Sequence, residues 1–235
     1  MIAKKKIHRF LLSSLPSLTI GETITIDDRR VSRHVHQVLK LQPGENIILF
    51  ADGGQNIVTE IMHADSALLT VSVKDIEAAA ALPRTVIAAI SIVKGDNFEL
   101  IVQKLTEIGI STIVPLITAR TVKQTVRNER LQLISDEALE QCGGTVRVQI
   151  TEPLSLAECF KQYPYQSVIL DPLAHATNAE LSGGAAVFYV GPEGGWSEQD
   201  ETVINACNPS YLQVTDRILR TETAAILAAY ALLWK

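Results

Sequence analysis

An alternation of strand-like and helix-like segments after residue 84 restricts the fold of this chain more than any other feature. The predicted strands are 86–91, 112–116 and 211–214, with others near Val146, Val168 and Val187, and the predicted helices are 96–108, 128–141, 197–207 and 221–234. This alternation is typical of a mostly parallel sheet with helices on both faces. We therefore expect an α/β domain.

The first part of the chain follows a different pattern. Its strand-like runs are short and separated by turn signals, and they lie at 23–26, 46–50, 57–62 and 68–73, with one helix at 29–39. Short strands at this spacing predict a small barrel. Residues 75–84 are rich in alanine and include Pro83, as expected for a linker. The predicted domains are therefore 1–74 and 75–235.

Charge is distributed unevenly along the chain. The 235 residues are 47% hydrophobic and 20% charged, as in a packed globular protein, and the net charge is −5. Residues 1–40 hold eight Lys/Arg against three Asp/Glu, a net +5, so the remainder carries −10. The net charge of −5 argues against a protein whose whole surface is basic and binds nucleic acid. The basic N-terminal part is either a surface for a polyanion or simply solvated.

Cysteine and histidine usage points to a reducing compartment and to no metal. The cysteines are few, odd in number and without a CxxC pair: Cys142, Cys159 and Cys207. This pattern predicts a cytoplasmic protein with buried, unreactive thiols. The longest apolar run, 224–234, is about half the ~20 residues that a membrane span needs. His34 and His36 are two apart on a helix and face different ways, so we expect no metal site.

One glycine-rich loop directly follows a predicted buried strand. Residues 191–195 read GPEGG, and Ser197 is placed to cap the helix behind them. Glycines let a backbone approach a ligand closely, and ligands of open α/β sheets bind at the carboxyl ends of strands. The loop matches neither common nucleotide signature, and Glu193 would repel a polyphosphate. A tight turn without a ligand is the alternative.

A second polar loop lies between the last strand and the last helix. Residues 212–223 read LQVTDRILRTET, which places Arg217, Arg220 and Glu222 near the start of a helix that Thr221 is expected to cap. An exposed ion pair between Arg220 and Glu222, worth about 0–1 kcal/mol, is the alternative to a functional role. Two polar loops at neighbouring strand ends favour one shared site.

Taken together, these motifs resemble those of a known family. GPEGG at 191–195 followed by RILRTETA at 217–224 is similar to the paired signature of the RsmE family, the 16S ribosomal RNA (uracil-N3)-methyltransferases of the SPOUT superfamily. Further similar segments occur in the same order, at 7–11, 34–44, 94–109 with 115–116, and 137–142. Two positions depart from the family pattern: Thr215-Asp216 replaces Leu-Gly, and Gly143-Gly144 stands where an arginine is usual, with Arg147 as its nearest substitute.

The resemblance implies a PUA-like RNA-binding β-barrel over 1–74, joined to an α/β methyltransferase domain with a deep trefoil knot. It further implies a homodimer through the knot domain and S-adenosylmethionine bound by three loops. The implied cofactor-binding residues are Leu170, Asp171, Pro172, Gly191, Pro192, Glu193, Gly194, Gly195, Val214, Thr215, Ile218, Leu219, Arg220 and Thr221.

The implied reaction methylates N3 of a uracil in the decoding region of 16S RNA, on the small ribosomal subunit. Uracil N3 must first lose its proton, so we expect Arg220 and Arg9 to stabilise the anion and Glu193 or Glu222 to orient an arginine or accept the proton. The expected RNA contacts are Arg9, Phe10, Arg33, Lys40, Lys94, Arg120, Lys123 and Arg147. The alternatives are a non-catalytic RNA-binding or ribosome-assembly factor, and a SPOUT methyltransferase acting on another RNA.

Overall fold

The computed structural model of the chain describes residues 7–94, 96–122, 124–171, 181 and 184–235. The chain forms two compact units, Met1–Ala80 with Leu139–Arg147, and Ala81–Ala138 with Val148–Lys235. The division thus falls six residues later than the predicted boundary at 74, and one segment of the later sequence returns to the first unit. The predicted linker at 75–84 is wrong in its first part, because residues 75–77 continue a strand.

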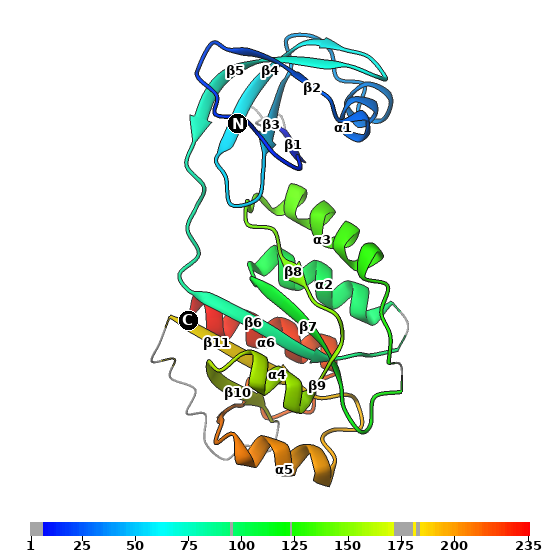
Figure 1. Cartoon of the computed structure of the whole chain (residues 1–235), viewed down its shortest axis with the longest axis vertical. Helices are drawn as coiled ribbons and strands as arrows, with labels where there is room; N and C mark the ends of the chain where they lie inside the picture. Colours follow the sequence, from blue (N-terminus) through cyan, green and yellow to red (C-terminus); the bar gives the residue numbers. More distant parts are fainter. Residues whose placement is uncertain (1–6, 95, 123, 172–180, 182–183) are drawn as a thin grey trace. The chain divides into compact units, whose positions relative to one another are not determined.

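The N-terminal unit is built on a five-stranded sheet (Figure 1). Its strands are β1 (His8–Leu11), β2 (Thr23–Ile26), β3 (Asn46–Phe50), β4 (Asn56–Ala64) and β5 (Leu69–Glu77), in the order β1-β3-β4-β5-β2. β1 pairs with β3 in parallel, and the other pairs are antiparallel. The sequence pattern missed β1, which has only four residues. No pairing of β1 with β2 is present among the described residues, so closure into a PUA-like barrel stays a prediction.

The predicted helix at 29–39 forms in two parts. An α-helical turn, α1 (Arg29–Arg33), passes into a π-helical turn, η1 (His34–Val38). Asp28 caps α1, because its carboxylate accepts hydrogen bonds from the backbone N–H groups of Arg30 (2.9 Å) and Val31 (3.2 Å). Val31 and Val35 are fully buried and anchor this helix in the apolar core of the sheet.

The returning segment, Leu139–Arg147, is held in the N-terminal unit by backbone and side-chain hydrogen bonds. Glu140 accepts from the backbone N–H of Leu11 (2.9 Å) and from Arg30 Nη1 (3.1 Å). Asp52 accepts from the backbone N–H of Arg147 (2.7 Å). Leu139 packs against Leu11 and Phe50 in a small buried cluster. These contacts explain why this segment belongs to the first unit.

The C-terminal unit is an α/β domain with a seven-stranded sheet, as the alternation predicts. Its strands are β6 (Thr85–Ser91), β7 (Thr112–Ile117), β8 (Gln149–Ile150), β9 (Leu154–Ser155), β10 (Gln166–Leu170), β11 (Ala185–Val190) and β12 (Ser210–Leu212). The order is β12-β10-β11-β6-β7-β8, with β9 also on β7, and every pairing is parallel. The helices are α2 (Asn97–Ile108), α3 (Asn128–Cys142), α4 (Leu156–Gln162), α5 (Glu198–Ala206) and α6 (Thr221–Trp234), and the end of α3 from Leu139 onward belongs to the N-terminal unit.

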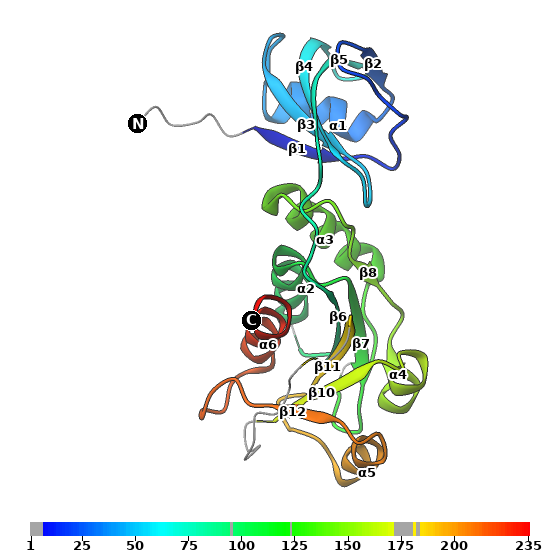
Figure 2. The same ribbon diagram turned by 90° about the vertical axis from the view of Figure 1, so that its left-hand side faces the viewer.

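Helices cover both faces of this sheet (Figure 2). Because side chains alternate along a strand, Ala88 and Ile90 of β6 join the core under α2 and α6. Ile87 and Ala89 point to the other face and join the core under α4 and α5. The packed faces leave the carboxyl ends of the strands as the place for a ligand site.

Two local predictions in this unit are wrong. The strand expected near Val146 is displaced, because Val146 lies in the segment docked on the N-terminal unit and β8 begins at Gln149. The pattern also missed α4, which has only seven residues but begins with a capping box between Ser155 and Glu158. In the described part of the chain, every helix is too short or too polar to span a lipid bilayer.

We expect Gly109→Ala to destabilise the protein. Gly109 ends α2 with φ = 104°, and a Cβ there would lie 2.7 Å from Leu82 Cδ2. The left-handed conformation alone costs a non-glycine residue about 1–2 kcal/mol, so the urea midpoint of unfolding should fall. Gly184→Ala is the control, because a Cβ at that position meets nothing within 4 Å. Equal midpoints for both variants would contradict the prediction.

We also expect stability to fall at alkaline pH because of two buried groups, Cys159 on α4 and Tyr189 on β11. Burial raises the pKa of Cys159 from 9.0 to about 12, and burial likewise raises the pKa of Tyr189 above its ordinary value of 10.0. The folded state therefore keeps both groups neutral where the unfolded chain ionises. The free energy of unfolding should decline as pH rises above about 9. Urea titrations at several pH values should show a flatter decline for the double variant Cys159→Ala/Tyr189→Phe, and an unchanged slope would refute this origin.

Candidate functional site

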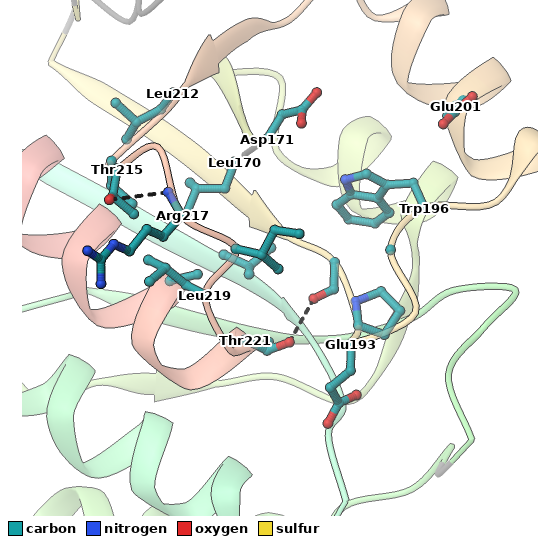
Figure 3. A pocket seen from close by; sticks show the side chains of 17 residues that line it. Leu170, Asp171, Glu193, Trp196, Glu201, Leu212, Thr215, Arg217, Leu219 and Thr221 are labelled. Carbon is teal, nitrogen blue, oxygen red and sulfur yellow. Dashed lines mark hydrogen bonds between the residues drawn. The ribbon is translucent and has the colours of Figure 1, made fainter. Parts of the chain in front are cut away.

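A pocket of about 340 Å³ lies at the carboxyl ends of β10, β11 and β12 (Figure 3). It is formed by the end of β10, the loop after β11 and the connection from β12 to α6. Eleven of the residues predicted for cofactor binding line it: Leu170, Asp171, Gly191, Pro192, Glu193, Gly195, Val214, Thr215, Ile218, Leu219 and Thr221. Gly194 and Arg220 lie in the same loops but not in the wall, and Pro172 is outside the described residues. The tertiary structure thus brings the two polar loops into one site.

The loop after β11 needs glycine at two positions for different reasons. A Cβ on Gly191 would lie 3.1 Å from Cε2 of Trp196, so the indole ring occupies the space of a side chain. Gly195 has φ = 70°, and its N–H donates to the carbonyl of Pro192 at 2.8 Å, which closes a tight turn. The loop is therefore both a glycine-rich turn and one wall of a pocket.

Helix α5 fixes the far end of this loop. Ser197 caps the helix, as predicted, and Asp200 completes a capping box by accepting from the backbone N–H (2.9 Å) and Oγ (2.8 Å) of Ser197. Asp200 is only 6% exposed. Because these bonds satisfy donors at a helix N-terminus, they hold the loop and the helix together.

Thr221 joins the two loops and does not cap α6 as expected. The N-cap of α6 is Arg220, in extended backbone conformation and without a capping hydrogen bond from its side chain. The Thr221 hydroxyl instead donates to the carbonyl of Gly191 at 3.1 Å, and the side chain is only 4% exposed (Figure 3). This bond ties the start of α6 to the glycine loop.

The pocket wall also contains residues that were not predicted for cofactor binding: Val190, Trp196, Glu201, Leu212, Arg217 and Ala224. Trp196 directly follows the glycine loop, so proximity in sequence was the signal that could have identified it. The described wall holds three carboxylates, on Asp171, Glu193 and Glu201, against the single cation of Arg217. Such a wall favours a ligand with positive charge.

The predicted catalytic residues fall in different places. Glu193 lines the pocket and is exposed, Arg220 is exposed at the start of α6, and Glu222 is half-buried in the first turn of that helix. Arg9 lies in the N-terminal unit, where it donates to Asn56 Oδ1 at 3.0 Å.

Arg9 is used in packing the N-terminal unit. Besides Asn56, its guanidinium donates to the carbonyl of Gly144 at 2.7 Å and lies 4.6 Å from the ring centroid of Phe50. Burial lowers the pKa of Arg9. These contacts give Arg9 a structural explanation, and its catalytic role stays a prediction that no contact in the structure supports.

The residues predicted to contact RNA differ in their exposure to solvent. Arg33, Lys40, Lys94 and Arg147 are exposed, and Lys123 is outside the described residues. Phe10 is 1% exposed in the core of the N-terminal unit, so the prediction that its side chain contacts RNA is wrong. Arg120 is exposed and donates to the glycine loop at Gly194.

The cysteines and possible metal ligands of the described residues do not gather into a second site. Cys159 is buried, as expected, but Cys142 and Cys207 are exposed, so the prediction of three buried thiols is wrong for these two. Among the described residues, no group of three or more His, Cys, Asp or Glu side chains is placed to hold a metal ion.

Comparison with known proteins identifies the family. Residues 80–233 match the RNA methyltransferase domain family, over nearly the whole of the unit that holds the pocket. The chain belongs to this family. The match to the RNA methyltransferase domain begins at residue 80, beside the boundary between the two units at Ala80 and Ala81.

Individual relatives confirm the resemblance to RsmE. Ribosomal RNA small subunit methyltransferase E of Synechocystis is 28% identical over 229 residues, covering 91% of this chain and 73% of that protein. The Bacillus subtilis protein of the same name is 25% identical over 218 residues, covering 85% of each chain.

Solved structures agree with the methyltransferase fold. Ribosomal RNA small subunit methyltransferase E of Neisseria gonorrhoeae, bound to S-adenosylmethionine, has a TM-score of 0.86 at 28% identity, with 96% of both chains covered. A methyltransferase of Legionella pneumophila with the same bound cofactor has a TM-score of 0.85 at 25% identity, covering 97% of both chains. The α/β class is thereby confirmed.

Proposed function

We propose that this protein methylates N3 of a uridine in the decoding region of 16S ribosomal RNA, on the small ribosomal subunit, with S-adenosylmethionine as methyl donor. The observation that carries the proposal is the meeting of the 191–195 and 212–221 loops in one pocket at the strand ends. Two methyltransferases with an overall fold similar to this chain, with TM-scores of 0.86 and 0.85, bind this cofactor, and one of them is a ribosomal RNA methyltransferase.

The pocket fits the proposed cofactor in size and chemistry. Its volume of about 340 Å³ lies within the usual range for small-molecule sites, about 300–1,000 Å³. Apolar side chains such as Leu170, Leu212 and Leu219 suit an adenine ring, and the glycine loop offers backbone groups. The acidic wall suits a cation. When bound, S-adenosylmethionine would supply a methyl group on a sulfonium, whose carbon accepts an aligned nucleophile in line while the C–S bond breaks and the neutral thioether leaves.

Residues around the start of α6 perform the remaining chemistry. Uracil N3 becomes a nucleophile only after losing its proton, and the resulting negative charge spreads onto the two flanking carbonyl oxygens. The Arg220 guanidinium donates hydrogen bonds to such an oxygen and stays charged at all relevant pH values. A carboxylate oxygen of Glu222 or Glu193 accepts the N3 proton or orients Arg220.

The other proposed features concern the whole protein. The N-terminal unit acts as a PUA-like RNA-binding domain, with Arg33 and Lys40 exposed for contact, and the connection from β12 to α6 forms part of a trefoil knot. The protein is a cytoplasmic homodimer through the knot domain. Large exposed apolar side chains on α6 support this interface, namely Leu227, Tyr230 and Trp234 at 40%, 50% and 52% exposure.

Mapping of modified uridines tests the function directly. Small subunits and naked 16S RNA are isolated from a strain that lacks the protein and are treated with the purified protein and S-adenosylmethionine. We expect one N3-methyluridine to be missing before treatment and to return on the subunits. Without a missing or restored N3-methyluridine, the proposed specificity is wrong, and failure to bind S-adenosylmethionine in calorimetry would favour the non-catalytic alternative.

A further inference from the structure

The turn after β7 lies against the glycine loop from outside the pocket. Arg120, in this turn, donates from Nη1 to the carbonyl of Gly194 at 2.5 Å. Its aliphatic stem lies along the same residue, because a Cβ on Gly194 would be 3.5 Å from Arg120 Cδ. Arg120 is absent from the pocket wall, so it contacts the loop and not the space the loop encloses.

The turn that carries Arg120 is internally fixed. Thr118 and Thr121 are 6% and 7% exposed, and their hydroxyl oxygens are 2.9 Å apart. The Thr121 hydroxyl also accepts from the backbone N–H of Thr118 at 2.9 Å, and the backbone N–H of Thr121 donates to the carbonyl of Thr118 at 3.0 Å. A rigid turn places its arginine at one position.

A second contact joins the same turn to the end of the loop. The backbone N–H of Ala119 donates to Asp200 Oδ1 at 3.5 Å, a long hydrogen bond to the carboxylate that caps α5. The turn therefore touches the segment between β11 and α5 at Gly194 and again at Asp200. On the pocket side, the same segment is held through Gly191 by Thr221.

We propose that Arg120 is a positioning residue for the cofactor, holding residues 191–195 in their binding shape through the carbonyl of Gly194. This inference rests on the proposed function, because it takes S-adenosylmethionine as the ligand of the pocket. Gly194 has no side chain, so its peptide orientation depends on backbone contacts, and Arg120 supplies a charged donor to one of them. Arg120 thus acts on cofactor affinity, whereas a direct RNA contact, as expected from the sequence, would act on RNA affinity.

The test compares Arg120→Ala and Arg120→Lys with the wild type. Loss of a charge-assisted hydrogen bond at an exposed site should weaken S-adenosylmethionine binding about tenfold in Arg120→Ala. Lysine keeps one charged donor, so Arg120→Lys should recover most of the affinity. The measurements are the Kd for S-adenosylmethionine by calorimetry, the KM for the RNA substrate, and the urea midpoint of the cofactor-free protein. We expect the KM for RNA and the midpoint to stay at the wild-type values.

Arg127→Ala is the matched control, since Arg127 is an exposed arginine on the same β7–α3 connection and outside the pocket wall. It should leave the Kd unchanged. A Kd within twofold of wild type in Arg120→Ala overturns the inference, as does a raised KM for RNA at constant Kd. A lowered urea midpoint that lysine does not restore also overturns it, by making the role structural. If the wild type itself fails to bind S-adenosylmethionine, the proposed function fails and this inference with it.

Discussion

Arg220→Ala should lower kcat for methyl transfer by about 10²–10³-fold, the usual cost of removing one donor that stabilises a developing anion. Arg220 is exposed beside the pocket, at the N-cap of α6, and its side chain makes no capping bond that the substitution would remove. It does not line the pocket wall, so the Kd for S-adenosylmethionine should stay within about twofold of the wild-type value, the difference expected of a side chain outside the contact surface.

Two variants make this result specific. Arg217→Ala is the comparison, because Arg217 lines the pocket and its loss should change the Kd for the cofactor more than kcat. Arg220→Lys keeps the charge but loses the planar fork, so it should recover only part of the rate. Single-turnover assays on small subunits measure the rate of methyl transfer, and calorimetry measures the Kd for S-adenosylmethionine. Unchanged turnover in Arg220→Ala would remove Arg220 from the mechanism.

Gly191→Ala should weaken S-adenosylmethionine binding by about ten- to a hundredfold, since inserting a methyl group into a packed site costs about 1–3 kcal/mol. The added Cβ would lie 3.1–3.4 Å from three atoms of the Trp196 ring, so the ring or the loop must move. Gly191 also accepts the Thr221 hydroxyl, so displacement of its backbone strains the bond between the two loops. Calorimetric titration of each variant with S-adenosylmethionine measures the change in Kd.

The role of the indole can be isolated with a double-mutant cycle. In a Trp196→Ala background the same methyl group has space, so Gly191→Ala should add little further loss of affinity. Gly184→Ala, with nothing within 4 Å of the added Cβ, controls for a glycine-to-alanine change in the same unit. Equal losses of affinity from Gly191→Ala in both backgrounds would show that the clash with Trp196 is not the cause.

The α/β domain followed from local pattern because its buried strands and amphipathic helices are long and regular. The runs around Ile90 and Ile113 form central strands, and the helix predicted for 96–108 ends at Ile108, before the left-handed Gly109. Short helices and strands contain too few residues to show a clear hydrophobic period in the sequence. This explains the missed four-residue β1 and the missed seven-residue α4.

Among the predicted site residues, the glycine loop was found because its sequence is unusual and directly follows a strand. The pocket residues on the connection from β12 to α6, including Thr215 and Leu219, were predicted from the resemblance to the RsmE family. The role of Thr221 could not be found this way, because its partner Gly191 is thirty residues away and a threonine before a helix ordinarily acts as a cap. The burial of Phe10 was missed for a similar reason, because its packing partners lie in distant segments of the chain.

The sequence by itself determined the two-part organisation, the parallel α/β class and the two loops in which the chemistry was sought. These properties depend on hydrophobic period, glycine and helix-capping residues, which act over a few neighbouring positions. The tertiary structure alone decided that residues 139–147 pack with the N-terminal unit, that Thr221 bonds to Gly191, and that Arg120 holds Gly194. Such contacts join residues 30 to 135 positions apart, and no local pattern encodes which distant partners folding brings together.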